Sequence, residues 1–443
     1  MDKDVLILGA GPAGLSTALH LARDCPHLAP RVLVLDKARH PRPKLCAGGL
    51  TIDAETILQR LGLDLREVPH ADASAAHFDF AGRGLSIRKR KGHVLRVIRR
   101  NEFDAWLAKK TRERGIEIRE GVTVKNVQPR QDCVVVETDA GTFTAQVVVG
   151  ADGSNGVTRR CVLPREPFHT ARVLEVITPE HLVTPALHQA HEVPMFFREC
   201  GASVASRSVA KQSPLSCGRL LATGTLRSRR AGLDTQRTLL DHRPPRNDGH
   251  AYFDFFPVPD GIAGYTWDFP TQINGQPMRC WGVYDANIYP EQRKPPLKET
   301  LAKEMARHGF NLDEFELQGY PIRWYDPFSE ISAPRVLLAG DAAGADPLFG
   351  EGISMALGYG ALAAREIREA FERGNFSFRR YRRRVARSAL GQTLVVRWAL
   401  AYFVYEIQWR GFQILPWRFL NPIVAGFAWL FILNWAKRLP DGK

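Results

Sequence analysis

The chain has 443 residues, of which 44% are hydrophobic, and carries a formal net charge of +14. This composition excludes a disordered chain and is typical of a globular α/β protein, and the length predicts two domains or one elaborated domain. Seven cysteines lie scattered without a C-x-x-C pair, so we predict neither a disulfide framework nor a metal site, and a reducing compartment. No secretory signal precedes the first apolar run, which predicts a location on the cytoplasmic side.

The basic residues are unevenly placed along the chain. Residues 201–249 and the run RRYRRRVAR at 379–387 hold much of the excess positive charge, which does not favour a nucleic-acid partner. The second run either forms a solvated helix face or is attracted to anionic lipid, at roughly 1 kcal/mol per basic residue near the surface. The composition of the aromatic tail that follows this run is the evidence that distinguishes the two interpretations.

The first elements of the chain predict a nucleotide-binding unit. Residues 4–8 (DVLIL) are typical of a buried parallel strand, GAGPAG opens a helix, and RVLVLD forms a second strand. Gly9 permits the tight turn, Gly11 lets the backbone approach a pyrophosphate, and Gly14 lets helix and strand pack closely. Phosphates then meet the N–H groups at the helix N-terminus, and Asp36 can accept hydrogen bonds from ribose hydroxyls. FAD and NAD both bind to such a unit, so other motifs are needed to tell which of the two cofactors this chain binds.

Three later segments complete the expected α/β part. NEFDAWLAKKTRERG at 101–115 predicts an amphipathic helix with its apolar side chains on one face. VVVGADG at 147–153 and RVLLAGDAAG at 335–344 predict two strands that end in aspartate-containing turns, and a helix follows the second of them.

Changes in composition along the sequence predict how these elements are divided into domains. We expect a discontinuous nucleotide-binding domain over 1–164 and 326–392, a second domain over 165–325, and a C-terminal helical region over 393–443. The second domain is rich in aromatics, prolines and short β-like runs. Within it, residues 200–249 lack aromatic residues and any sustained period, which predicts a disordered insertion without an assigned function.

Further motifs resemble the FAD signatures of the large flavoprotein family that includes the aromatic hydroxylases and the geranylgeranyl reductases. They are Arg100 before EFDAWL, Asp152 in GADG, and Asp341 with Gly350 and Gly352 in GDAAGADPLFGEG. The resemblance implies a Rossmann-like FAD-binding domain with an inserted α+β substrate domain. Because only one G-x-G-x-x-G motif is present, it also implies an external reductant, NAD(P)H or a ferredoxin. The cofactor-binding residues that we assign on this basis are Gly9, Gly11, Ala13, Gly14, Asp36, Lys37, Lys44, Cys46, Ala47, Arg100, Asp152, Asp341, Gly350, Gly352 and Ile353.

Two more motifs resemble the geranylgeranyl reductase branch of that family. KLCAGG, with Cys46, is similar to its K-x-C-x-G-G loop, and YTWDFP is similar to its Y-x-W-x-F-P motif. In a strand, Tyr265, Trp267 and Phe269 project to one face, so three rings would line one wall of an apolar slot. We assign Tyr265, Trp267, Phe269 and Pro270 to substrate binding. The chain departs from the branch afterwards: Gly282 comes later than expected, and Tyr284 replaces a second glycine.

The resemblance implies reduction of a carbon–carbon double bond in a prenyl chain. An isolated alkene is poorly electrophilic, so hydride delivery from a reduced flavin requires a proton source or stabilisation of positive charge by aromatic faces. We predict Cys46, Tyr265 and Trp267 as catalytic residues, with Cys46 holding the flavin loop, donating the proton or limiting access. Two alternatives stay open: an FAD-dependent monooxygenase of a hydrophobic substrate, and a non-catalytic, FAD-containing, lipid-binding protein. A halogenase is less favoured because we find no W-x-W-x-I-P motif.

The C-terminal tail is the most aromatic stretch of the chain. From Phe419 to Trp435 it carries no charge, but this run is slightly short for a membrane-spanning helix and contains Pro422. Tryptophan and tyrosine are spread through residues 394–436, downstream of the arginine run. This pattern predicts an interfacial membrane anchor, with a helical cap over the substrate domain or a single spanning segment as alternatives.

Overall fold

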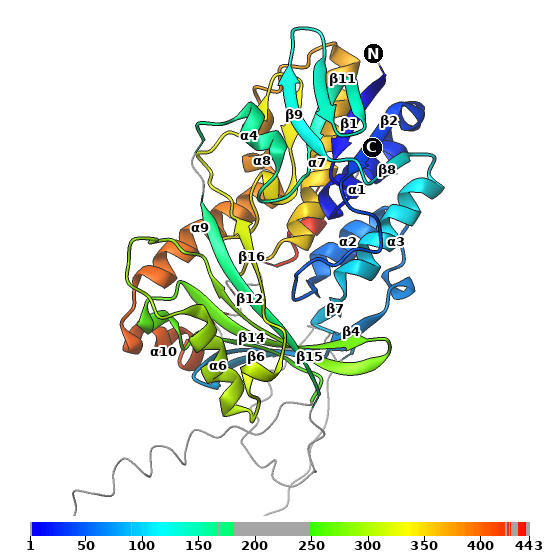
Figure 1. The fold of residues 1–443 in the computed structure, drawn as a ribbon. Helices are drawn as coiled ribbons and strands as arrows, with labels where there is room; N and C mark the ends of the chain where they lie inside the picture. Colours follow the sequence, from blue (N-terminus) through cyan, green and yellow to red (C-terminus); the bar gives the residue numbers. More distant parts are fainter. Residues whose placement is uncertain are drawn as a thin grey trace, which may run out of the picture. The chain divides into compact units, whose positions relative to one another are not determined.

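The computed structural model describes residues 2–89, 91–166, 169–180, 248–420, 423, 424, 426 and 433–439. The predicted insertion over 200–249 lies outside the described residues except for its last two positions, and so does much of the chain after residue 420. The described elements form three sheets with helices around them (Figure 1).

The first sheet is the expected nucleotide-binding sheet. Its main path runs β17–β18–β11–β1–β2–β8, and the contacts between β18, β11, β1, β2 and β8 are all parallel. β9 and β10 form an antiparallel extension next to β11. The strands of this sheet are β1 (Lys3–Leu8), β2 (Val32–Asp36), β8 (Glu117–Glu120), β9 (Val124–Pro129), β10 (Val134–Thr138), β11 (Gly141–Gly150), β17 (Ser332–Ala333) and β18 (Val336–Leu338).

The helices lie at the places that the sequence predicts for the first domain and continue through the tail. They are α1 (Pro12–Asp24), α2 (Ile52–Arg60), α3 (Arg100–Glu113), α4 (Val157–Val162), α6 (Leu297–Arg307), α7 (Ile353–Arg373), α8 (Tyr381–Arg387), α9 (Ala389–Glu406) and α10 (Arg410–Arg418). The predicted apolar face of α3 is confirmed, since Phe103 and Leu107 are fully buried and Trp106 is 9% exposed.

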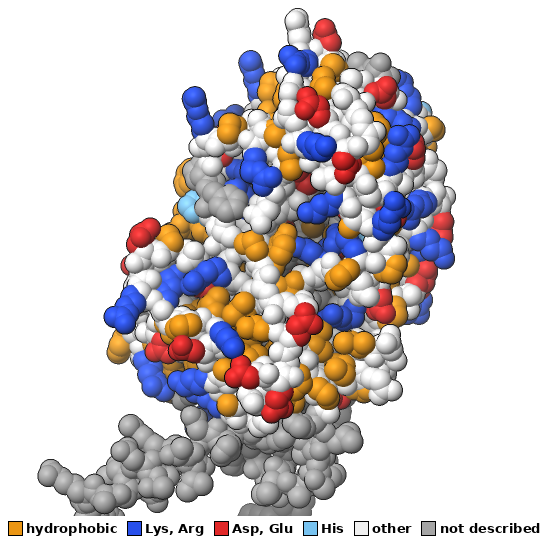
Figure 2. Space-filling view, in the orientation of Figure 1, with side chains coloured by type: hydrophobic (Ala, Val, Ile, Leu, Met, Phe, Trp, Pro, Cys, Tyr) orange, Lys and Arg blue, Asp and Glu red, His pale blue; other side chains and the backbone are white. Residues whose placement is uncertain are grey.

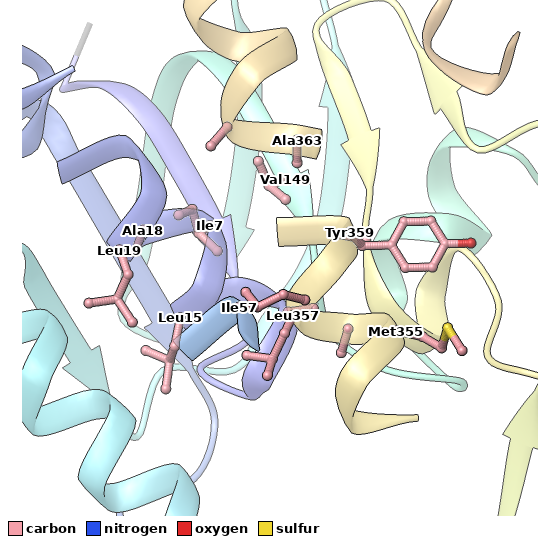
Figure 3. Close-up of a cluster of buried hydrophobic side chains, with 14 of the residues drawn as sticks. Ile7, Leu15, Ala18, Leu19, Ile57, Val149, Met355, Leu357, Tyr359 and Ala363 are labelled. Carbon is pink, nitrogen blue, oxygen red and sulfur yellow. The ribbon is translucent and has the colours of Figure 1, made fainter. Parts of the chain in front are cut away.

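The core of the nucleotide-binding part lies between α1, α7 and the first sheet. Figure 3 shows Leu15 and Leu19 of α1, Leu357 of α7 and Ile7 of β1 in one buried cluster. α7 approaches α1 closely because Gly360 has no side chain; a Cβ there would lie 2.5 Å from the Cβ of Ser16. Each fully buried side chain of this size contributes about 1.5–3 kcal/mol. This packing fixes the position of the N-terminus of α1 relative to the N-terminus of α7. Both N-termini belong to the site described below.

The second sheet is mixed and carries the aromatic motif. Its order is β16–β12–β15–β14–β13–β5–β6, antiparallel except for the parallel pair of β13 and β5. One face carries the rings of β14, and the other packs against α6 through Val176, Trp281 and Val283. Its strands are β5 (Ala75–Phe80), β6 (Arg83–Arg88), β12 (Thr170–Pro179), β13 (Ala251–Asp254), β14 (Gly264–Ile273), β15 (Gln276–Asp285) and β16 (Gln318–Arg323).

The expected domain boundaries differ from the sheet boundaries in one respect. β5 and β6 come from residues 75–88, which the sequence analysis assigned to the first domain, yet they pair with β13 of the second sheet. A small third sheet connects the two larger ones and consists of β3 (Gly49–Leu50), β4 (His70–Ala73) and β7 (Leu95–Ile98). The fold is α/β, with a Rossmann-like nucleotide-binding part, an additional mixed sheet and C-terminal helices, as predicted.

The C-terminal helices α9 and α10 pack over the second sheet, as Figure 1 shows in orange and red. The ring of Trp417 on α10 stacks on Phe255 with a centroid distance of 4.5 Å. In the part of the chain that the structure describes, no helix is long and apolar enough to cross a membrane. The described helices therefore form a cap on the sheet, which was one of the three alternatives for the tail.

Candidate functional site

The glycine-rich turn after β1 has the geometry that the motif predicts. Gly9 has a φ of +112°, and a Cβ there would lie 2.3 Å from the carbonyl oxygen of Ala151. A Cβ on Gly14 would lie 2.0 Å from the carbonyl oxygen of Gly9, so no side chain fits where α1 meets the turn. Gly11 borders open space, and the nearest atoms to its missing side chain are guanidinium nitrogens of Arg42 at 3.7 Å and Arg100 at 4.0 Å.

These features form an anion site at the start of α1. The helix begins with Pro12, without an acidic residue in its first turn and without a side-chain cap, so its positive end is free to face a phosphate. Arg100 forms two hydrogen bonds of 2.8 Å to the buried Asp104, and Arg42 lies 3.2 Å from the same carboxylate. Burial alone would lower the pKa of Arg100, but Asp104 raises it above the ordinary value, so this side chain stays cationic.

Asp36 stands at the end of β2, as predicted for a ribose contact. Its carboxylate already accepts hydrogen bonds from the backbone N–H of Ala10 at 2.6 Å and of Ala38 at 2.8 Å. It therefore also fixes the glycine-rich turn. His40 contacts the carbonyl oxygen of Ala10 at 3.1 Å through Nε2 and supports the same turn from the other side.

Asp152 and Asp341 lie at neighbouring positions because β11 and β18 are adjacent parallel strands. Oδ2 of Asp152 accepts hydrogen bonds from the backbone N–H and the hydroxyl of Thr158, at 2.8 and 2.9 Å. Oδ1 of Asp152 is buried without a hydrogen-bond partner, and burial raises the pKa of this carboxyl. The hydroxyl of Ser154 donates to Asp341 at 3.4 Å. The unpaired oxygen is an acceptor that a hydroxyl of a bound cofactor would satisfy.

The second glycine-rich loop, residues 346–352, is held by three tyrosine hydroxyls from distant elements. Tyr265 of β14 donates to the carbonyl of Phe349 at 2.5 Å, Tyr284 of β15 to Pro347 at 2.9 Å, and Tyr405 of α9 to Leu348 at 2.6 Å. After this loop α7 begins without a side-chain cap on its N-terminal N–H groups. The arrangement leaves these donors available to the electron-rich edge of a flavin ring.

Arg397 ties α9 to the same loop. Its guanidinium is 1% exposed and lies 2.7 Å from Asp346 and 2.5 Å from Glu351. The other oxygen of Glu351 accepts a hydrogen bond from Thr51 at 2.8 Å. The sequence analysis missed Arg397; the available signal was one arginine inside the apolar stretch LVVRWAL.

The cysteine-containing loop joins the site at the edge of the third sheet. The Sγ atom of Cys46 accepts a hydrogen bond from the N–H of Gly48 at 3.4 Å, and burial raises the pKa of the thiol. The thiol is therefore protonated at neutral pH. The ammonium group of Lys44 lies 3.1 Å above the centre of the Tyr320 ring, and burial lowers its pKa to about 8.

The aromatic motif forms the wall that its alternation predicts. Tyr265, Trp267 and Phe269 are each 5% exposed and share one face of β14. Trp267 pairs with Gly282, and a Cβ on that glycine would lie 2.1 Å from Cζ2 of the indole, so the ring covers the glycine. Gly282, displaced in sequence from the family pattern, thus makes room for the tryptophan. Pro270 is the exception among the predicted substrate residues. It follows Phe269 directly, so it points to the opposite face of β14, and it does not line the cavity.

One cavity of about 760 Å³ joins these parts. Every predicted cofactor residue lines it except Gly14, which acts through packing. Apolar side chains outside the predicted set also line it. They include Ala76, Phe78, Ile87, Val94, Leu95, Phe253 and Leu433.

One family model and several curated proteins are similar to this chain. Residues 2–217 match the family model described as FAD binding domain. An uncharacterized protein of Methanosarcina barkeri is 26% identical over 395 residues, which cover 87% of this chain and 80% of that protein. Protein FixC of Escherichia coli is 32% identical over 167 residues, which cover 35% of this chain and 37% of FixC.

Solved structures share the fold at low sequence identity. A geranylgeranyl bacteriochlorophyll reductase-like protein from Thermoplasma acidophilum has a TM-score of 0.64 and 18% identity, with 99% of both chains covered. The flavin-dependent halogenase CmlS has a TM-score of 0.56 and 20% identity, covering 99% of this chain and 68% of its own. The p-nitrophenol 4-monooxygenase PnpA from Pseudomonas putida has a TM-score of 0.56 and 16% identity, covering 98% and 99%. The family match and the residues of the cavity both support FAD as the cofactor.

Proposed function

We propose that this FAD-binding oxidoreductase saturates carbon–carbon double bonds in a prenyl chain of the geranylgeranyl type. The observation that carries the proposal is the single cavity, which brings the Cys46 loop, the 346–352 loop and the aromatic wall of β14 together. A prenyl chain is long, flexible and apolar, and the aromatic wall of β14 is joined in the cavity by further apolar side chains such as Phe78, Ile87 and Phe253. The head group of the chain stays open in this proposal.

In this proposal, the cofactor and each group of residues in the site have separate roles in the reaction. FAD, when bound and reduced, supplies a hydride. The Cys46 thiol supplies the proton that the second alkene carbon needs, since burial keeps it protonated at neutral pH. The rings of Tyr265 and Trp267 face the cavity and stabilise positive charge that develops on the alkene. The apolar wall excludes water from the reacting carbons.

Two similarities support this assignment over its alternatives. The Thermoplasma neighbour is described as geranylgeranyl bacteriochlorophyll reductase-like and covers nearly the whole chain. The Cys46 loop and the aromatic triplet, which resemble the reductase branch, contact one cavity. The halogenase and monooxygenase neighbours favour the alternative of oxygen-dependent chemistry on a hydrophobic substrate. The external reductant is proposed to be NAD(P)H or a ferredoxin, because one nucleotide-binding motif serves one nucleotide.

An anaerobic assay tests the proposal. Purified protein is incubated with a reductant and a panel of geranylgeranyl lipids, and each saturated bond adds the mass of H2 to the product. We expect Cys46→Ala to keep bound FAD and to lose alkene reduction, and Cys133→Ala, in the β9–β10 turn, to keep both. A product that requires oxygen supports the monooxygenase instead, and absence of turnover with every lipid supports the non-catalytic alternative.

We also propose that the protein lies on the cytoplasmic face of a membrane through its C-terminal helices. Large apolar side chains are exposed there: Phe403 is 57% exposed, Trp409 73% and Phe419 71%. Arg380, which precedes α8, lines an open basic hollow together with Arg383, Arg384 and Arg387 of that helix. Figure 2 shows that Lys and Arg elsewhere on the drawn face are interspersed with acidic residues, which does not favour a nucleic-acid partner. Exposed aromatic side chains suit the interface of a lipid bilayer, and the arginines of the hollow suit anionic head groups.

Vesicle flotation tests this second proposal. The protein should float with vesicles that contain anionic lipid and less with neutral ones. Replacing Phe403, Trp409 and Phe419 by alanine should reduce flotation, whereas Ile273→Ala, an exposed apolar residue at the end of β14, should not. Equal flotation of the triple variant and the wild type would contradict the proposed anchor.

A further inference from the structure

Glu175 is a buried carboxyl group on the second sheet, in the strand next to the edge strand β16, and the proposed chemistry does not use it. It lies on β12 and pairs with Gly282 of β15 on one side and Gln318 of β16 on the other. Its side chain is 3% exposed. Val173, two positions earlier on the same face of β12, lines the cavity, so this face of the strand is the one that looks toward the site.

The surroundings of Glu175 connect it to two of the three predicted catalytic residues, Trp267 and Cys46. Because Trp267 also pairs with Gly282, the order across the sheet is Trp267, Gly282, Glu175, and the indole lies over the intervening glycine. The Cys46 backbone N–H and the Cys280 thiol face the carboxylate of Glu175 and favour its charged form. The Glu175 charge in turn acts on the Cys46 thiol.

The carboxyl group of Glu175 lacks part of the hydrogen bonding and all of the ion pairing that a buried carboxylate usually has among the described residues. Oε2 is buried without a hydrogen-bond partner, and no described lysine or arginine forms an ion pair with this side chain. The positive charge of Arg99 acts on it from a greater distance. Burial raises the pKa of Glu175 to about 7, since this opposing charge is too weak to offset desolvation. A buried acid that changes charge near neutral pH, in contact with a site, is a candidate for proton transfer.

We propose that Glu175 is an internal proton reservoir that restores the proton of the Cys46 thiol. The inference rests on the proposed function, in which Cys46 gives up its proton to the substrate. The carboxyl proton of Glu175 passes to the Cys46 sulfur, the S–H bond forms as the carboxyl O–H bond breaks, and the carboxylate later takes a proton from water. No electrons are transferred in this step. Glu175 acts through Cys46 and is therefore a positioning residue.

The test measures the reactivity of Cys46 without any substrate. FAD-loaded wild type and E175Q are alkylated over a range of pH, and the rate at each cysteine is read by peptide mass spectrometry. Above pH 7 the ionised Glu175 raises the pKa of the Cys46 thiol, so Cys46 should react severalfold faster in E175Q than in the wild type at pH 8. Below pH 6 the carboxyl is neutral, and the two rates should coincide. Cys133 and Cys161, partly buried free thiols on other elements, serve as internal references and should react equally in both proteins.

Two further measurements keep the proposal open to refutation. If E175Q does not fold, the wild type alone suffices, because its Cys46 rate profile must bend near pH 7, where Glu175 titrates. In the prenyl assay, E175Q should lower kcat severalfold and leave KM unchanged. Coinciding Cys46 profiles for wild type and E175Q, or a straight wild-type profile through pH 7, would overturn the inference. Absence of prenyl reduction by the wild type contradicts the proposed function alone, because the alkylation result does not depend on turnover.

Discussion

Replacing Arg397 by methionine tests whether the C-terminal helix α9 holds the 346–352 loop in place. The guanidinium is fully enclosed and contacts Asp346 at 2.7 Å and Glu351 at 2.5 Å. Methionine keeps much of the side-chain volume but leaves two carboxyl groups together without a cation. Removal of one partner of a buried ion pair costs about 3–5 kcal/mol, and we expect Arg397→Met to lower the free energy of unfolding by about that amount.

The loss of stability in Arg397→Met should be larger at high pH than at low pH. Burial raises the pKa of Asp346, whereas Arg397 and neighbouring hydroxyls lower that of Glu351 against the effect of burial. Without the arginine both carboxyls are more easily protonated in the folded state than in the unfolded state. The destabilisation is therefore complete only above the raised folded-state pKa values of these carboxyls, and it becomes smaller as the pH falls through them toward the unfolded-state values.

Urea unfolding and FAD release measure the two consequences. Arg387→Met is the matched control, since it makes the same change on an exposed face of α8 and should alter stability by about 0.5 kcal/mol or less. Arg397→Met should also release FAD more readily, because Glu351 precedes Gly352 at the start of α7. Adding Asp346→Asn to Arg397→Met should recover part of the lost stability. Unfolding of Arg397→Met at the same urea concentration as the wild type would refute the reasoning.

Three other outcomes are expected. Gly14→Ala should abolish FAD binding, read from flavin absorbance, because its Cβ would lie 2.0 Å from the Gly9 carbonyl; retained flavin would contradict the proposed close packing. Gly282→Ala should displace the Trp267 ring, 2.1 Å from the new methyl, so that FAD stays bound while prenyl turnover falls at least tenfold. Burial lowers the pKa of His20 to about 4, so stability should fall by up to about 3 kcal/mol as the pH drops from 6.5 toward 4, and His20→Gln should flatten this dependence.

The sequence by itself determined those features that depend on neighbours in the chain. Gly9, Gly11 and Gly14 fall within six residues, and their spacing alone predicts a turn that opens a helix. The alternation of Tyr265, Trp267 and Phe269 places three rings on one face of a strand wherever that strand lies. Asp152 and Asp341, which follow β11 and β18, were assigned from the resemblance of their local motifs to FAD signatures, whereas the adjacency of the two strands comes from the structure.

Only the tertiary structure decided which distant residues complete the site. Arg42 reaches Asp104, Arg397 reaches Asp346 and Glu351, and Glu175 lies beside the Cys46 loop, each across a long separation in the chain. A single arginine in an apolar helix, or one glutamate in a strand, has no local pattern that names its partner. Partners of this kind are set by strand order and helix packing, which bring together side chains whose charges would be costly to bury alone. For the same reason the pairing of β5 with β13 was not evident from the residues of either strand.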